Sequence, residues 1–210
     1  MFSIKKYITI TILFFSCILS NAQNTISSDN NIWQLKRNTG GIKVYTKKVN
    51  NSDILVFKAV TIINAGFSKV ASVIQDTKYC KQWMDRVKTI KILKKINNNN
   101  YYTYIETFVP WPFSNRDIIL LYNVIKTDKS IIIKLTSIPD YIPNKPGIVR
   151  MKEGTGYWKI SKINYHKSLV EYSFFSDPGG NLPNWLTNTF IEDVPFNTLK
   201  NLRKIFSSTQ

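Results

Sequence analysis

Few residues of this 210-residue chain could carry catalytic chemistry, and their positions do not bring them together. The one histidine, His166, lies in a polar turn, which is a poor place for a general base. A hydrolytic triad needs a nucleophile, a base and a group that orients the base, and the sequence offers no such set. Glu106 and Glu153 are separated by several expected strands. We therefore expect no catalytic residue and no enzymatic activity.

The same scarcity argues against a metal or a cofactor. A zinc site takes several Cys, His or acidic ligands, and the chain has one histidine and two cysteines, Cys17 and Cys80. Cys80 lies in an expected helix, where a structural thiol is more common than a reactive one. The glycines at 154 and 156 are too few for a phosphate-binding loop, and they precede a strand. We expect no metal and no cofactor.

Arg116 and Asp117 are the charged residues with the most informative spacing. Neighbours on a strand point to opposite faces of the sheet, so these two side chains cannot simply pair with each other. Ion-pair networks as well as active sites use such groups. We interpret the two residues as members of separate networks that fix strand ends, with a catalytic role as the alternative.

Strands must position most of these side chains. Between residues 87 and 176, alternating apolar and polar stretches are separated by turn residues such as Asn97–Asn100 and Thr127–Lys129, which is typical of β-hairpins. The expected strands are Ile42–Lys47, Ile54–Ile63, Val87–Ile96, Tyr101–Val109, Asp117–Lys126, Ser130–Ile138, Ile148–Met151, Tyr157–Ile163 and Ser168–Ser176.

Apolar residues at helical spacing occur in four further segments. The glycines at 40 and 41 are expected to end the first of them. Pro183 suits the first turn of the last one, and Pro195 is expected to kink it midway because proline removes a backbone donor. The expected helices are Asn31–Asn38, Phe67–Ile74, a short segment around Trp83, and Pro183–Phe206.

These elements describe one α+β domain. An antiparallel sheet must bury one face, and the long amphipathic C-terminal helix is the element that can cover it. A strongly curved sheet around one helix can leave a hollow between them, and such hollows hold ligands. We expect a curved antiparallel sheet wrapped around the C-terminal helix, with an internal apolar cavity.

Residues 1–22 are typical of a signal peptide. Two lysines precede an apolar run of about 13 residues, and small or polar residues lead to Ala22, where cleavage is expected. The run is short for a membrane-crossing helix, which needs roughly 20 residues, and a permanent membrane anchor is the alternative. Cys17 fits a lipoprotein cleavage site poorly. We expect residues 23–210 to form one exported domain, periplasmic or secreted.

The chain is strongly basic, with 29 Lys and Arg against 13 Asp and Glu and a net charge of +16. Such a balance would suit a nucleic acid. The lysines are scattered through every expected element without a dense cluster, so we expect no nucleic-acid partner. Transient contact with an anionic membrane surface is the preferred interpretation, and simple solvation of the surface is the alternative. We expect a monomer.

Four segments, in one order and spacing, carry a family resemblance. Pro110–Asp117 reads PWPFSNRD, a Pro-x-Ser-x-Arg-Asp pattern, and Asp177–Pro183 reads DPGGNLP, an Asp-x-x-Gly-x-Leu-Pro pattern. Trp33 followed by Gly41–Tyr45 forms an opening segment, and Ile148–Arg150 falls after a long loop. These segments are similar to those of START (StAR-related lipid-transfer) domains.

The resemblance covers about residues 30–206, and it implies a helix-grip fold. It also implies non-enzymatic binding and transfer, or sensing, of a hydrophobic ligand such as a lipid. The wider superfamily includes polyketide cyclases, so a cavity enzyme of the cyclase or aromatase type is the alternative. A structural or partner-binding role is a third possibility.

Strand alternation and the resemblance predict which side chains face the cavity. Packing in an ordinary core is the alternative for each of them. Some sterol-carrying members have a buried arginine and an acid where this chain has Tyr122 and Thr103, which favours a neutral or weakly polar ligand here. The predicted ligand-binding residues are Thr103, Ile105, Ile118, Leu120, Tyr122, Ile133, Leu135, Arg150, Trp158, Tyr172, Phe174, Leu186 and Phe190.

The proline-rich loop 139–147 lies where the family has a gating loop. Tyr141 and Ile142 are apolar residues on this expected surface loop. We expect the loop and the C-terminal helix to move apart at a membrane and admit lipid, with Pro195 as the hinge. The alternative is a rigid loop whose Tyr and Ile pack locally.

Overall fold

The structure is a computed structural model of the chain, and it describes residues 32–49, 54–180, 182–183, 186–187 and 189–207. The predicted signal peptide lies outside these residues. Within them, no helix combines the length and the apolar character needed to cross a membrane.

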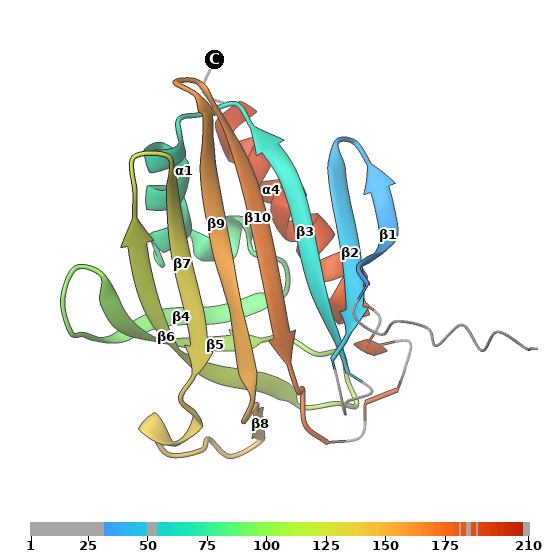
Figure 1. Cartoon of the computed structure of the whole chain (residues 1–210). Helices are drawn as coiled ribbons and strands as arrows, with labels where there is room; N and C mark the ends of the chain where they lie inside the picture. Colours follow the sequence, from blue (N-terminus) through green and yellow to red (C-terminus); the bar gives the residue numbers. More distant parts are fainter. Residues whose placement is uncertain (1–31, 50–53, 181, 184–185, 188, 208–210) are drawn as a thin grey trace, which may run out of the picture.

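Ten strands in the described residues form one sheet that curves around the C-terminal helix (Figure 1). Neighbouring strands run antiparallel in the order β1-β2-β3-β10-β9-β7-β6-β5-β4, and the short β8 pairs in parallel with the beginning of β6. The strands are β1 (Gln34–Thr39), β2 (Ile42–Lys48), β3 (Leu55–Ile63), β4 (Val87–Lys95), β5 (Asn100–Thr107), β6 (Asn115–Lys126), β7 (Ser130–Ser137), β8 (Ile148–Arg150), β9 (Gly154–Asn164) and β10 (Lys167–Ser176).

Helices cover the concave side of the sheet. The C-terminal helix α4 packs against β2, β3 and α2, while α1 packs against β7, β9 and β10 (Figure 1). The predicted α+β architecture, a curved antiparallel sheet around a C-terminal helix, is therefore confirmed. The helical elements are α1 (Phe67–Gln75), α2 (Cys80–Trp83), the 3-10 turn η1 (Pro139–Tyr141), the π-helical turn η2 (Thr189–Asp193) and α4 (Val194–Ser207).

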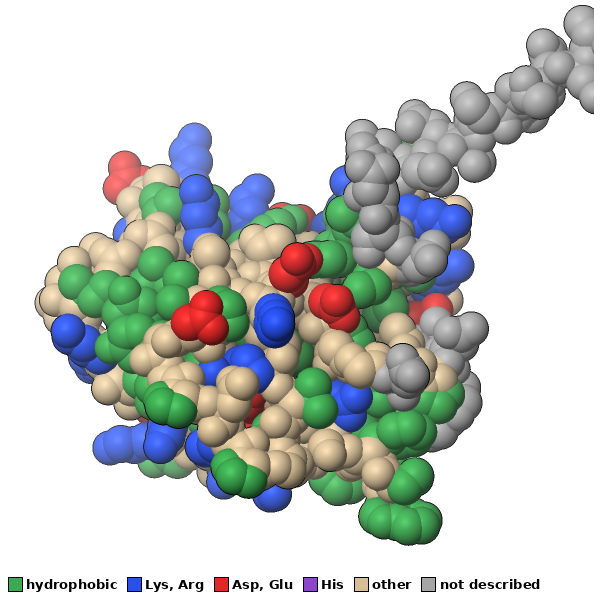
Figure 2. Space-filling model, turned by 90° about the horizontal axis from the view of Figure 1, so that it is seen from below, with side chains coloured by type: hydrophobic (Ala, Val, Ile, Leu, Met, Phe, Trp, Pro, Cys, Tyr) green, Lys and Arg blue, Asp and Glu red, His purple; other side chains and the backbone are tan. Residues whose placement is uncertain are grey.

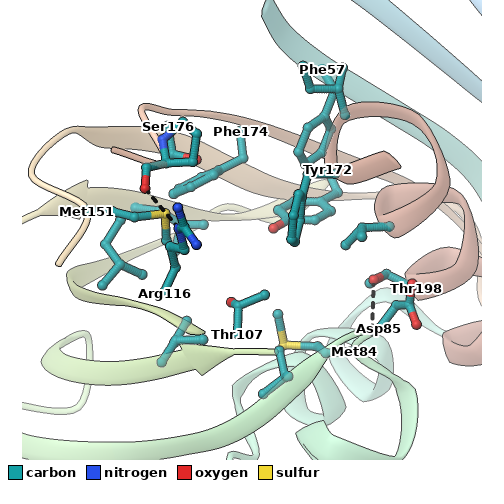
Figure 3. A pocket seen from close by; sticks show the side chains of 18 of the residues that line it. Phe57, Met84, Asp85, Thr107, Arg116, Met151, Tyr172, Phe174, Ser176 and Thr198 are labelled. Carbon is teal, nitrogen blue, oxygen red and sulfur yellow. Dashed lines mark hydrogen bonds between the residues drawn. The ribbon is translucent and has the colours of Figure 1, made fainter. Parts of the chain in front are cut away.

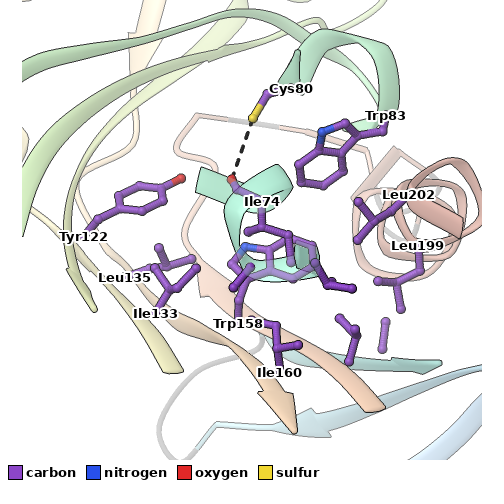
Figure 4. Close-up of a cluster of buried hydrophobic side chains, with 14 of the residues drawn as sticks. Ile74, Cys80, Trp83, Tyr122, Ile133, Leu135, Trp158, Ile160, Leu199 and Leu202 are labelled. Carbon is purple, nitrogen blue, oxygen red and sulfur yellow. Dashed lines mark hydrogen bonds between the residues drawn. The ribbon is translucent and has the colours of Figure 1, made fainter. Parts of the chain in front are cut away.

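Apolar side chains from the strands and the helices form one core between the sheet and the helices that cover it (Figure 4). Ile42, Val44 and Thr46 of β2 point inward and are buried, because side chains alternate across a strand. Leu199 and Leu202 of α4 are fully buried in the same cluster. The rings of Trp83 and Trp158 meet edge to face at 5.8 Å, an arrangement that aromatic pairs prefer.

The predicted helix over Asn31–Asn38 is wrong, because most of this segment is the strand β1. Gly40 and Gly41 both have positive φ, 57° and 73°, as a two-residue hairpin turn requires. They place Thr39 opposite Ile42, so β1 pairs with β2. The ladder stabilises the strand, whereas an isolated helix of two turns is marginal in water. The Gly-Gly pair marks a hairpin here and not the end of a helix.

The predicted helix over Pro183–Phe206 is described as helix from Thr189 onward, and the type of helix changes within it. The π-helical turn η2 ends at Asp193, and regular α-helix begins at Val194. Pro195 is the second residue of α4, so the change from π-helix to α-helix falls just before the residue that lacks a backbone donor. Residues 184, 185 and 188 of the predicted helix lie outside the described residues.

The first prediction concerns a glycine at the centre of the sheet. A Cβ atom at Gly156 would lie 2.2 Å from the carbonyl oxygen of Ser173 and 2.6 Å from the ring of Phe174. Gly156→Ala should therefore lower the free energy of unfolding by about 1–3 kcal/mol, measured by urea denaturation. Thr155→Ala, at the exposed neighbouring position, is the control. Equal stability of the two variants would show that β9 and β10 are not so closely packed.

Candidate functional site

An apolar cavity lies between the concave side of the sheet and the C-terminal segment (Figure 3). Its volume is about 140 Å³. The wall includes nine of the residues predicted to bind a ligand. They are Ile105, Ile118, Leu120, Tyr122, Leu135, Trp158, Tyr172, Phe174 and Phe190.

The register of the sheet explains why these side chains meet. Ile105 of β5 lies opposite Ile118 of β6, and Tyr122 of β6 lies opposite Leu135 of β7. Residues two apart on a strand share a face, so one side of β6 presents a row of side chains to the cavity. Three adjacent strands thus form one continuous part of the wall.

Aromatic rings follow one another along the wall and into the core. The ring of Phe57 meets that of Tyr172 edge to face at 5.0 Å, and Tyr172 stacks on Trp158 at 3.9 Å. Trp158 in turn meets Trp83. Burial raises the pKa of the Tyr122 and Tyr172 hydroxyls well above the ordinary value, so both are neutral polar groups in an apolar wall.

The wall also contains residues that the sequence analysis missed. Leu55 and Phe57 could have been found, because strand alternation places them on one face of β3. Others come from irregular segments, where no periodicity indicates a direction. The missed wall residues are Ile54, Leu55, Phe57, Met84, Asp85, Val87, Thr107, Arg116, Met151, Ser176, Pro178, Leu182, Thr187, Ile191, Val194 and Thr198.

Four of the predicted ligand-binding residues lie outside the wall. Thr103, Ile133 and Leu186 are buried. The hydroxyl of Thr103 has no hydrogen-bond partner within the described part of the chain. The fourth residue, Arg150, uses its guanidinium for a different set of contacts.

Arg150 and Asp117 form a buried ion pair. The guanidinium donates two hydrogen bonds to the carboxylate, at 2.7 and 3.1 Å, and the two side chains are 4% and 1% exposed. The same guanidinium also donates to the carbonyl oxygens of Pro139, Ile142 and Pro143. Arg150 therefore fastens loop 139–147 to β6.

Arg116, the neighbour of Asp117, forms part of the cavity wall and makes a second, separate set of hydrogen bonds. Its guanidinium donates to the carbonyl oxygens of Ser114 at 2.6 Å, Gly179 at 3.2 Å and Pro178 at 3.3 Å. The sequence interpretation, two separate networks on opposite faces of one strand, agrees with this geometry. The alternation that places Ile118 in the wall also applies to Arg116, so that signal was present in the sequence.

The predicted gate residues are packed in the described conformation. The ring of Tyr141 stacks on Tyr102 of β5, with the ring centres 4.2 Å apart. Ile142 is half-buried, and its carbonyl accepts a hydrogen bond from Arg150. Pro195 is buried. Loop 139–147 is thus held both by aromatic stacking and by Arg150.

The remaining candidates for reactive chemistry are satisfied by local partners. Burial, and then the charge of Asp76, raise the pKa of the Cys80 thiol to about 12. Burial also raises the pKa of Glu106, but hydrogen bonds from Lys88 and Asn115 outweigh it and keep that pKa below the ordinary value. Within the described ranges, no group of three or more His, Cys, Asp or Glu side chains could hold a metal ion.

Comparisons with known proteins agree with this architecture. The START domain family model matches residues 15–210. An uncharacterized protein of Pseudomonas aeruginosa is 32% identical over 90% of this chain and 92% of its own length. Human phosphatidylcholine transfer protein is 27% identical, with 82% of each chain covered. The crystal structure of a STAR-related lipid transfer protein from Xanthomonas axonopodis superposes with a TM-score of 0.75 and 32% identity, covering 83% of this chain and 98% of that one.

The second prediction tests the fastening of loop 139–147. Arg150→Gln would leave the carboxylate of Asp117 buried without its cation and free three loop carbonyls. We expect the free energy of unfolding to fall by about 3–5 kcal/mol, with faster hydrogen exchange in residues 139–147. Lys152→Gln, at an exposed site nearby, is the control. Unchanged exchange in the loop of the Arg150 variant would contradict the role assigned to this residue.

Proposed function

Because this chain belongs to the START domain family, we propose that it binds a lipid or a similar hydrophobic molecule in its cavity and transfers or senses it, without catalysing a reaction. The observation that carries the proposal is the apolar wall, built from aliphatic and aromatic side chains of seven strands and the C-terminal segment. Two of the similar proteins are named for lipid transfer, and their similarity extends over most of this chain.

The size of the cavity indicates that loading requires movement. An engineered protein cavity of about 150 Å³ holds a molecule the size of benzene. The cavity of about 140 Å³ is therefore too small for a lipid tail in the described conformation. We infer that the bound state is wider, and that the segments around the cavity must separate to reach it.

Two segments have the contacts expected of a gate. Ile191, Val194 and Thr198 of the C-terminal segment lie in the wall, so a shift of that segment enlarges the cavity directly. The change from π-helix to α-helix just before Pro195 supplies a place for it to bend. Loop 139–147 lies beside β8 and is held by Arg150 and by the stacking of Tyr141 on Tyr102. We propose that these two segments form the gate.

A membrane surface is the proposed partner at the β8 end of the molecule. Trp111, in the turn between β5 and β6, is 91% exposed, and Phe108 in the same turn is 49% exposed. Aromatic side chains of this kind favour the membrane interface. Figure 2 shows this end, where Lys and Arg side chains lie among hydrophobic ones. Cleavage of residues 1–22 would remove Lys5 and Lys6 from the net charge of +16, and the remaining charge of +14 adds attraction to anionic lipids.

The proposal for the cellular location rests on the signal-peptide features of residues 1–22. We propose that residues 1–22 direct export and that residues 23–210 act in the periplasm or outside the cell. The scattered lysines support a membrane partner over a nucleic acid. We also propose that the protein acts as a monomer.

The third prediction tests whether the cavity holds lipid. Native mass spectrometry of the purified protein, followed by lipid extraction, should reveal close to one lipid per chain. Ile118→Trp should remove most of the bound lipid, because the larger ring fills the cavity. Ile125→Trp, at a partly exposed site on the same strand, should leave it bound. Absence of lipid from the wild-type protein would contradict the proposal, and a chemically altered product would instead favour a cavity enzyme.

The fourth prediction tests the membrane-facing end. Trp111→Ala should weaken binding to phosphatidylcholine–phosphatidylserine vesicles about tenfold, because a large exposed apolar side chain is lost. Tyr165→Ala removes an aromatic that is 81% exposed in the β9–β10 turn, at the opposite end, and should leave vesicle binding unchanged. In the wild-type protein, vesicles should speed hydrogen exchange in residues 139–147 and 189–207. Equal binding by the two variants would place the contact elsewhere.

A further inference from the structure

Arg116 is a buried cation without an acidic partner in the described part of the chain. The residue is 5% exposed, and no described carboxylate lies within ion-pair distance of it. Burial lowers the pKa of its guanidinium, as expected where the charged form is poorly compensated. A buried charge normally has a counter-charge, because an unpaired one is costly.

The hydrogen bonds of Arg116 use some of the N–H donors of its guanidinium, but they do not neutralise its positive charge. A guanidinium has five N–H donors. Three of them donate to the carbonyl oxygens of Ser114, Pro178 and Gly179. Carbonyl groups are neutral dipoles, so the positive charge remains, and two donors are left for another acceptor.

Acidic side chains around Arg116 have other partners. Asp177, which precedes Pro178, is exposed and accepts a hydrogen bond from the backbone N–H of Gly179. Asp117 points to the opposite face of β6 and binds Arg150. Glu106 accepts from Lys88 and Asn115. The acid in the cavity wall, Asp85, lies on the far side of the cavity from Arg116 in Figure 3. The end of the cavity at Arg116 is therefore positive.

The cavity wall around Arg116 is polar and would suit the polar end of an amphiphilic ligand. Thr107 and Ser176 lie in the wall on the same side as Arg116 (Figure 3) and add hydroxyl groups. From Ile118, the wall continues along β6 with the apolar side chain of Leu120 and the ring of Tyr122. A ligand with one anionic end and one apolar tail matches both parts.

We propose that Arg116 anchors an anionic headgroup, a carboxylate or a phosphate, so that the ligand is an acidic amphiphile with its tail along β6. The inference rests on the proposed function and names the ligand class. This ligand class differs from the neutral or weakly polar ligand that Tyr122 and Thr103 favour in the sequence. The reason is that a different residue, Arg116, supplies a positive charge to the cavity wall. Arginine recognises both anionic groups by paired hydrogen bonds.

The fifth prediction compares three probes that share one tail. The wild-type protein, freed of bound lipid, is titrated with dodecanoate, dodecyl phosphate and dodecanol, and the dissociation constants are measured by calorimetry. At least one of the two anionic probes should bind about tenfold more tightly than dodecanol. The stronger of the two anions identifies the headgroup. Equal binding of all three overturns the anchor but leaves the cavity function standing, whereas no binding of any probe, with no co-purified lipid, overturns that function.

Variants assign the preference to Arg116. Arg116→Gln should abolish the preference for the anionic probes, and Arg116→Lys, which keeps the charge, should retain part of it. Arg203→Gln removes one surface arginine and should leave the preference unchanged. If Arg116→Gln does not fold, the wild-type titration and the lysine variant decide the question. A folded Arg116→Gln protein that still prefers the anions overturns the assignment.

Discussion

The buried ion pair between Asp117 and Arg150 is the interaction on which one end of the molecule depends. Neither charge could be buried alone, since removing one partner of such a pair costs about 3–5 kcal/mol. Once paired, Arg150 has donors left for three carbonyls of loop 139–147. On the opposite face of β6, Arg116 holds the carbonyls of residues 178 and 179. Two adjacent residues thus fix two separate loops, because a strand directs its neighbours to opposite faces.

An unfilled cavity lowers the stability of the fold, and the side chains around this one are not large enough to fill it. By the cost found for cavities of known volume, about 140 Å³ left unfilled would lower the free energy of unfolding by about 3 kcal/mol. Larger side chains could fill it, since Thr107 and Val87 are small residues in the wall. On β9 the packing is the reverse. A Cβ atom at Gly154 would lie 2.5 Å from Ile118, and one at Gly156 would lie 2.2 Å from the carbonyl oxygen of Ser173. Tight packing on one strand beside open space on the next supports a cavity retained for a ligand.

The sequence predicts the strands and much of the wall because alternation has a fixed period. Tyr122 and Leu120 follow from that period alone, and both lie in the wall. The period predicts which face of a strand a side chain is on, but not whether it reaches the cavity. Thr103 is therefore on the same face as Ile105 but lies outside the wall. Arg150 could not be placed, because its partners are carbonyls of a loop whose path no local pattern indicates. The strand β1 was missed because the Gly40–Gly41 pair suits both a helix end and a hairpin, and only pairing with β2 distinguishes them.

Arg116 and Arg150 have different roles in the proposed function. Arg116 would hold the ligand, whereas Arg150 holds a loop of the proposed gate. Three donors of Arg116 are committed to carbonyls, and an anion that takes the other two would leave those bonds in place. Headgroup binding at Arg116 would then reinforce the junction at residues 178 and 179 instead of releasing it. Opening must come from a change that acts elsewhere, at loop 139–147 or in the C-terminal segment. Because Arg116 and Arg150 act on opposite faces of β6, the affinity for a ligand and the ease of opening can vary independently.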